Sequence, residues 1–126
     1  MNQLYPKPKA LIVEDSTSLA AFYATALESA GYETEIMING HEAQLWLAKT
    51  VPDFVLLDLH LPYVTGDKLL QQIREDSRMD ETIVFLASSD PLQARMLQNE
   101  ADIVLNKPIS YSQLRDLSGR FRQIKE

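Results

Sequence analysis

Four short apolar runs of the sequence each end at polar residues that could take part in phosphoryl-transfer chemistry. The runs cover residues 10–13, 54–57, 83–87 and 103–105, and the polar residues at their ends are Glu14 with Asp15, Asp58, Ser88, and Asn106 with Lys107. In open α/β sheets, ligands bind beyond the carboxyl ends of parallel strands. The pattern therefore predicts three carboxylates, a hydroxyl and an ammonium at one edge of a sheet.

Three carboxylates at one edge repel one another unless a cation joins them. Mg2+ is the natural candidate, because it prefers hard oxygen ligands and is usually completed by water and phosphate oxygens. We expect Asp15 to bind the ion directly, and Glu14 to bind it directly or through water. The Asp58 carboxylate could also be a nucleophile that takes a phosphoryl group. The structural alternatives are that Glu14 and Asp15 begin and cap a helix and that Asp58 ends a strand.

Two further side chains and one carbonyl could complete such a site. Lys107 precedes Pro108, which fixes the local backbone, so its ammonium can pair with Asp58 and later with a phosphate oxygen. Ser88 offers a hydroxyl to a second phosphate oxygen. The backbone carbonyl of His60 could join the metal shell, whereas its imidazole is interpreted as an exposed loop group. Alternatively, Ser88 is a cap and Lys107 lies in an ordinary loop.

The periodicity of apolar residues predicts the elements that must position these groups. We expect a lead-in at residues 1–9 and strands at residues 10–13, 33–38, 54–57, 83–87 and 103–105. Helices are expected at residues 16–30, 41–49 and 66–76, from residue 91, and at residues 110–124. Every crossover is long enough for a helix, which favours a parallel sheet covered on both faces. The polar strand at 33–38 belongs at an edge, so the predicted order is 2-1-3-4-5.

Composition narrows the class of protein. The 126 residues fit one domain, and 12 Lys and Arg against 18 Asp and Glu give a net charge of −6. This charge disfavours direct binding to nucleic acid or to an anionic membrane. The absence of cysteine excludes disulfides and thiolate metal sites. Without a signal-like segment or an apolar stretch long enough for a bilayer, the sequence predicts a soluble cytoplasmic protein.

Taken together, the motifs resemble the receiver domain of bacterial two-component response regulators, of the chemotaxis-regulator type. The matching segments run from residue 9 to residue 124 and are residues 11–16, residues 56–62 with Gly66, Ser88, Ala101-Asp102, and Lys107-Pro108. The resemblance implies a flavodoxin-like three-layer sandwich of five strands and five helices. It implies a phosphoryl group received on Asp58 from a sensor histidine kinase or a histidine phosphotransfer protein. It also implies Mg2+ held by Glu14, Asp15, Asp58 and the His60 carbonyl, and a Lys107–Pro108 bond that can be cis.

The sequence departs from the family pattern at three places. Val104 stands three residues before the lysine, where the family has an aromatic residue, so we expect no aromatic rotation there. The segment between Ser88 and Lys107 is a few residues short, which predicts a trimmed loop or fourth helix. It also leaves open whether Ser88 or Ala87 takes the hydroxyl position. Glu100 replaces a favoured glycine, so the turn into the last strand should need a different helix ending.

The leading hypothesis is a receiver that transfers the phosphoryl group to itself and loses it slowly, with no other enzymatic reaction. The alternative is a receiver-like interaction module that acts independently of phosphate, as Val104 and the short fourth region suggest. A haloacid-dehalogenase-like phosphatase should have a second Asp at position 60, which is His. A flavodoxin should not have Glu14 and Asp15 where the flavin phosphate binds.

The downstream partner is expected to be an effector protein or a C-terminal output domain. A phosphorylation-dependent homodimer could use the last helix, through residues interpreted either as a partner face or as a solvated surface: Tyr111, Arg115, Arg120 and Arg122.

Overall fold

The computed structural model describes residues 6–122 and places five parallel strands in one sheet. The strands are β1 (Lys9–Val13), β2 (Glu33–Met37), β3 (Phe54–Asp58), β4 (Ile83–Ser88) and β5 (Ile103–Asn106). Their order is β2-β1-β3-β4-β5, and all four pairings are parallel. The predicted strand order is therefore confirmed.

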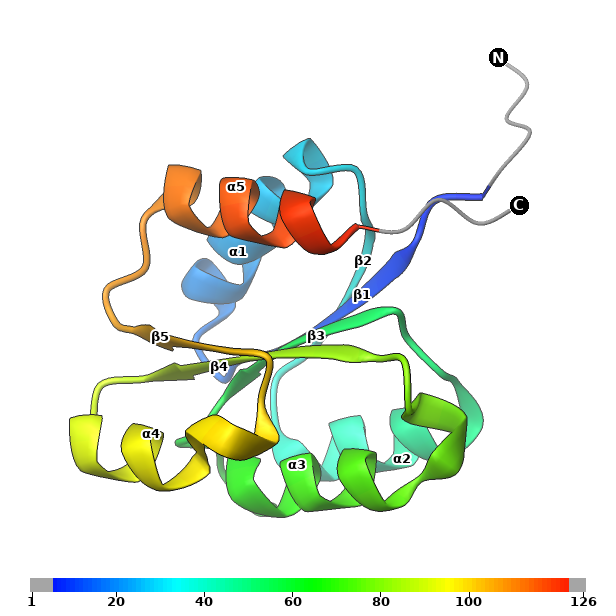
Figure 1. The fold of residues 1–126 in the computed structure, drawn as a ribbon, viewed down its shortest axis with the longest axis vertical. Helices are drawn as coiled ribbons and strands as arrows, with labels where there is room; N and C mark the ends of the chain where they lie inside the picture. Colours follow the sequence, from blue (N-terminus) through cyan, green and yellow to red (C-terminus); the bar gives the residue numbers. More distant parts are fainter. Residues whose placement is uncertain (1–5, 123–126) are drawn as a thin grey trace.

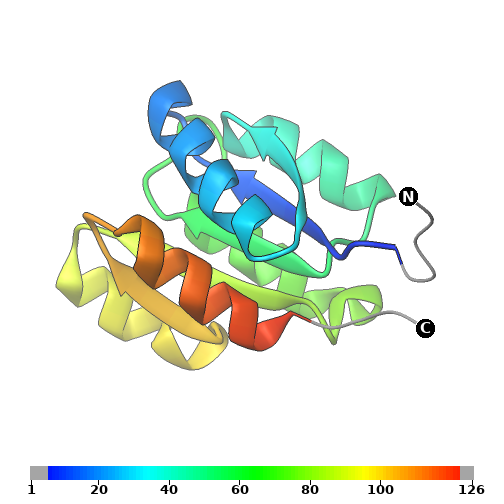
Figure 2. The same cartoon turned by 90° about the horizontal axis from the view of Figure 1, so that it is seen from above.

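Helices cover both faces of the sheet (Figure 1). One face carries α1 (Thr17–Ser29) and α5 (Tyr111–Phe121), which lie side by side in both views (Figure 2). The other carries α2 (Gly40–Lys49), α3 (Gly66–Glu75) and α4 (Pro91–Leu97). Two short 3-10 turns, η1 (Ser77–Met79) and η2 (Gln98–Glu100), precede β4 and β5. The expected three-layer, flavodoxin-like sandwich is confirmed.

Strand alternation divides the interior into two cores. Successive side chains of a strand point to opposite faces, so Phe54 and Leu56 of β3 pack toward α1 and α5. Val55 and Leu57 pack toward α2 and α3. Every residue of β3 is buried, as expected of a central strand. The same alternation, continued past the strand ends, assigns Glu14, Asp58 and Lys107 to the α1/α5 side of the sheet.

The helix ends and the edge strand lie where the sequence indicates, except for the end of α5. The Ser16 hydroxyl accepts a hydrogen bond from the Leu19 N–H at 3.3 Å and caps α1, while Gly31 follows the helix with φ of 104°. The edge strand β2 is mostly exposed, as predicted. The last helix was expected to reach residue 124, but α5 ends at Phe121. The last two residues of the expected helix, 123 and 124, lie outside the described residues.

The turn into β5 is closed by Arg74 and Asp102. The helix α4 has only seven residues and is followed by η2, so the predicted shortening falls on the fourth helix. Arg74 Nε donates to the Glu100 carbonyl at 2.7 Å, and its Nη2 contacts Asp102 Oδ2 at 3.1 Å. The same oxygen accepts the Val84 N–H at 2.7 Å. These bonds provide the different helix ending that Glu100 was predicted to need.

Tyr32 ties the loop after α1 to the end of α5. Its side chain is buried, and its hydroxyl donates to the Ser118 carbonyl at 2.9 Å. This carbonyl is one of the last four of α5, which lack partners within the helix. Burial raises the pKa of the Tyr32 hydroxyl above its ordinary value, although Arg122 acts in the opposite direction.

The substitution Tyr32→Phe should lower the free energy of unfolding by about 0.5–1.5 kcal/mol at neutral pH, because it removes one buried hydrogen bond. Since the folded-state pKa is raised, the contribution is complete below about pH 10, the ordinary tyrosine pKa, and falls as the pH rises above it. Denaturant unfolding of both proteins between neutral and alkaline pH measures this. A difference in stability that does not shrink at alkaline pH would contradict the prediction.

Candidate functional site

Three carboxylates meet beyond the carboxyl ends of β1 and β3. Glu14, Asp15 and Asp58 each offer one oxygen such that these oxygens all lie within 4.8 Å of one another. Glu14 and Asp58 are buried, at 2% and 4% exposed, whereas Asp15 is exposed. Two carboxylates of the cluster are therefore buried, and the third, that of Asp15, is open to solvent.

Lys107 brings the ammonium of the site from the end of β5. Its Nζ lies 3.0 Å from Glu14 Oε1 and 3.3 Å from Asp58 Oδ2. Burial alone would lower the pKa of Lys107, but its hydrogen bond with Glu14 and the charges of Asp58 and Glu14 raise the pKa above its ordinary value. The side chain therefore stays an ammonium at neutral pH and binds both buried carboxylates.

Burial and a neighbouring charge act against the ionised form of Glu14. Burial raises the pKa of Glu14, and so does the charge of Asp58, while hydrogen bonds from the Ser16 N–H and from Lys107 lower it. The net direction is upward, so burial outweighs the hydrogen bonds that favour the ionised form. The clustered carboxylate oxygens of Glu14, Asp15 and Asp58 are ligands that suit a hard divalent cation such as Mg2+.

Backbone contacts fix the loop that follows Asp58. The His60 N–H donates to Asp58 Oδ1 at 3.2 Å, which places the backbone of this residue beside the cluster, while its side chain is exposed as interpreted. A Cβ atom at Gly66 would lie 2.5 Å from the Asp58 carbonyl oxygen. Only glycine allows α3 to begin this close to the strand. The Lys107–Pro108 bond is cis, as the resemblance allowed.

Ser88 is not brought to this cluster. The residue of β4 in register with Asp58 is Ala87, which packs in the core beneath α1 and α5. Ser88 comes one residue later and belongs to the opposite face of the strand. Its hydroxyl donates to the Asp90 carbonyl at 3.1 Å and accepts the Asp90 N–H at 2.9 Å. The sequence left open whether Ser88 or Ala87 takes this position, and the count of residues from Phe54 to Asp58 and from Ile83 onward favours Ala87.

The surface predicted for a dimer differs in one respect from the expectation. Tyr111 was expected to be exposed but is half-buried, because its ring packs edge-on against Phe22 at 6.2 Å between centroids. Its hydroxyl also forms a hydrogen bond with Ser29. Arg115 lies over the same ring, 5.7 Å from its centroid, and pairs with Asp116. Tyr111 therefore joins α5 to α1 rather than presenting a free aromatic side chain.

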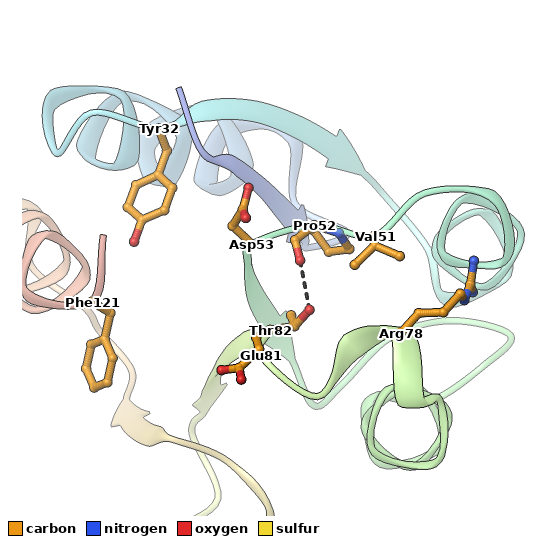
Figure 3. Close-up of a pocket in the computed structure, with 8 residues that line it drawn as sticks. All are labelled: Tyr32, Val51, Pro52, Asp53, Arg78, Glu81, Thr82 and Phe121. Carbon is orange, nitrogen blue, oxygen red and sulfur yellow. Dashed lines mark hydrogen bonds between the residues drawn. The ribbon is translucent and has the colours of Figure 1, made fainter. Parts of the chain in front are cut away.

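A small cavity of about 140 Å³ lies at the opposite edge of the sheet, where β3 and β4 begin (Figure 3). Several of its polar groups have partners inside the protein. The Thr82 hydroxyl donates to the Pro52 carbonyl at 2.8 Å, and Arg78 donates to carbonyls at the end of α2. The cavity is far from the carboxylate cluster along the strands and takes no part in it.

Comparison with known proteins gives matches over most of the chain. A family model described as the response regulator receiver domain matches residues 10–118. The phosphate regulon transcriptional regulatory protein PhoB of Rhizobium meliloti is 31% identical over 110 residues, which are 85% of this chain and 48% of that protein. The hybrid signal transduction histidine kinase D of Dictyostelium discoideum is 29% identical over 88% of this chain and 7% of its own length.

A solved structure gives the same picture. The chemotaxis response regulator CheY4 of Vibrio cholerae superposes with a TM-score of 0.83 at 26% identity, over 92% of this chain and 99% of that one.

The chain spans less than half the length of the curated relatives it matches. Among residues 6–122, the helices are all too short or too polar to cross a membrane.

The close approach of α3 to Asp58 predicts opposite effects for two glycine substitutions. Gly66→Ala should lower the free energy of unfolding by about 1–3 kcal/mol, because the added methyl group meets backbone atoms that cannot rotate away. Gly119→Ala, in α5, has open space around the added atom and should raise the stability by up to about 1 kcal/mol. Denaturant unfolding measures both. Equal effects of the two substitutions would contradict the packing described at Gly66.

Proposed function

Because the chain belongs to the family of response regulator receiver domains, we propose that Asp58 accepts a phosphoryl group from a phosphohistidine of a partner protein. The observation that carries the proposal is the position of Asp58, which lies within 4.8 Å of two other carboxylates and 3.3 Å from the Lys107 ammonium. An aspartate that only ended a strand would need neither arrangement.

Each residue of the site has a proposed part in the transfer. An Asp58 oxygen forms a bond to phosphorus as the bond between phosphorus and the donor's imidazole nitrogen breaks. Lys107 already contacts this carboxylate and can hold charge on a phosphoryl oxygen once the acyl phosphate has formed. The His60 N–H, bound to Asp58 Oδ1, keeps the carboxylate oriented.

Glu14, Asp15, Asp58 and the backbone carbonyl of His60 are the proposed holders of Mg2+. When bound, the ion would neutralise charge on the carboxylates and the phosphoryl oxygens. A bound cation would oppose the burial and the charge of Asp58, which both raise the pKa of Glu14. Because Asp15 is exposed, the ion could reach the cluster from solvent beside this residue.

The proposed partners follow from the relatives. These include transcriptional regulatory proteins and sensor or hybrid histidine kinases, so the phosphoryl donor is a histidine kinase or a phosphotransfer protein. The output passes to an effector protein or to a C-terminal output domain, with homodimerisation on phosphorylation as one form. The chain carries out no reaction beyond its own phosphorylation and dephosphorylation, and acts in the cytoplasm without binding nucleic acid or membrane.

A second candidate function is a receiver-like module that binds a partner protein whether or not Asp58 is phosphorylated. The observation that favours it is the pairing of Ala87 with Asp58, which leaves β4 without a hydroxyl at this level. Val104 on β5 adds to it, since an aliphatic side chain stands at the usual aromatic position.

The proposed function is tested by intact mass after incubation with acetyl phosphate, with and without Mg2+. The native chain should gain one phosphoryl group only when Mg2+ is present, and Asp58→Asn should gain none. Asp67→Asn, which removes an exposed carboxylate in the first turn of α3, is the matched control and should react like the native chain.

Three results would decide against the proposal. They are an absence of mass gain in the folded native protein, a gain that persists in Asp58→Asn, and a gain that does not depend on Mg2+. The first would favour the phosphate-independent module.

A further inference from the structure

The strand β4 lies between the strands that carry Asp58 and Lys107, and it leads directly into α4 (Figure 1). A change of charge at Asp58 could move α4 through β4 only if a group at the end of this strand bonded to the new charge. The side chains at the end of β4 therefore decide whether α4 can respond.

The side chain beside Asp58 on β4 offers no hydrogen bond. Ala87 is in register with Asp58, is 1% exposed, and packs in the core beneath α1 and α5. Side chains in register on neighbouring parallel strands share a face of the sheet. The methyl group of Ala87 therefore stands where a polar side chain would contact a phosphoryl group on Asp58.

The nearest hydroxyl on β4, that of Ser88, already forms hydrogen bonds with the residue that caps α4. Ser88 is fully buried, and its hydroxyl both donates to and accepts from the backbone of Asp90. The carboxylate of Asp90 in turn accepts the N–H groups of Leu92 and Gln93, which caps α4. Turning the Ser88 hydroxyl toward Asp58 would break both of its bonds and loosen this cap.

Val104, the side chain of β5 beside α4, also has little freedom to change position. Val104 is half-buried on the α4 side of the sheet, in register with Leu86. A β-branched side chain is restricted at χ1 and has no distal group to rotate. Beside it lies an open hollow of about 230 Å³, whose lining includes Ala94 of α4 and Gln98 of η2.

The loop between β3 and α3, residues 59–65, is instead bonded to the site directly. The His60 N–H contacts Asp58 Oδ1, and the Pro62 carbonyl accepts the Gly40 N–H at the start of α2. Tyr63 in this loop is 84% exposed and has φ of 70°, the left-handed region that non-glycine residues seldom adopt. Such backbone positions are found at sites that switch.

We propose that a phosphoryl group on Asp58 changes the β3–α3 loop around Tyr63 and leaves α4 in place. The inference rests on the proposed function, because it needs an occupied Asp58. It assigns the surface that reports phosphorylation to the loop itself, since neither Ala87 nor the committed hydroxyl of Ser88 connects Asp58 to α4.

The first test uses amide NMR spectra of the full chain with Mg2+ alone and with Mg2+ plus beryllium fluoride, which mimics a phosphoryl group on aspartate. We expect shifts in residues 58–66, while residues 91–97 of α4 move no more than residues 116–121 at the distant end of α5. Shifts in α4 as large as those in the loop would overturn the inference. An absence of shifts everywhere would contradict the proposed function instead, so the two failures are distinguishable.

The second test restores the missing hydroxyl. Ala87→Thr and Ala87→Val add side chains of the same shape, but only threonine carries a hydroxyl. With beryllium fluoride, α4 should respond in Ala87→Thr and not in Ala87→Val. Ala87→Ser, which adds a single heavy atom, gives the same comparison with the native chain if the larger residues overpack the core. Identical behaviour of α4 with and without the hydroxyl would contradict the explanation.

Discussion

Repulsion among Glu14, Asp15 and Asp58 is the interaction on which the arrangement of the whole sheet edge depends. Two like charges about 4 Å apart interact by about 4 kcal/mol at an effective dielectric constant of 20. Lys107 offsets part of this repulsion through its contacts with Glu14 and Asp58. Burial is the largest cause of the raised pKa of Glu14, and the charge of Asp58 adds to it. A bound divalent cation would offset the repulsion among the three carboxylates that Lys107 leaves.

The rest of the fold holds these groups where they would not remain by themselves. Buried strands with alternating faces put Glu14, Asp58 and Lys107 on the same side of the sheet. Gly66 lets α3 begin against the Asp58 carbonyl, and Arg74 with Asp102 closes the turn that leads into β5. The two apolar cores thus provide the stability that the charged edge reduces.

Much of this could be predicted from the sequence, because continuous apolar runs and helical periodicity are strong local signals. The five strands, their order and the meeting of the three carboxylates followed from them. The choice between Ser88 and Ala87 stayed open because the end of a strand is uncertain by one residue, and one residue reverses the face of a side chain. The register of the strands pairs Ala87 with Asp58. The bonds of Arg74 to Glu100 and the packing of Tyr111 on Phe22 join distant segments, so no local pattern indicates them.

The most direct test of the account is the free energy of unfolding of the native chain and of Asp15→Asn across a series of Mg2+ concentrations. Asp15 is exposed, so its substitution should leave the fold intact. The account predicts that the stability of the native chain rises with the logarithm of Mg2+ concentration once the site saturates. It predicts that this rise is lost in Asp15→Asn. A free energy of unfolding of the native chain that does not change with Mg2+ concentration, or an equal rise in both proteins, would contradict the account.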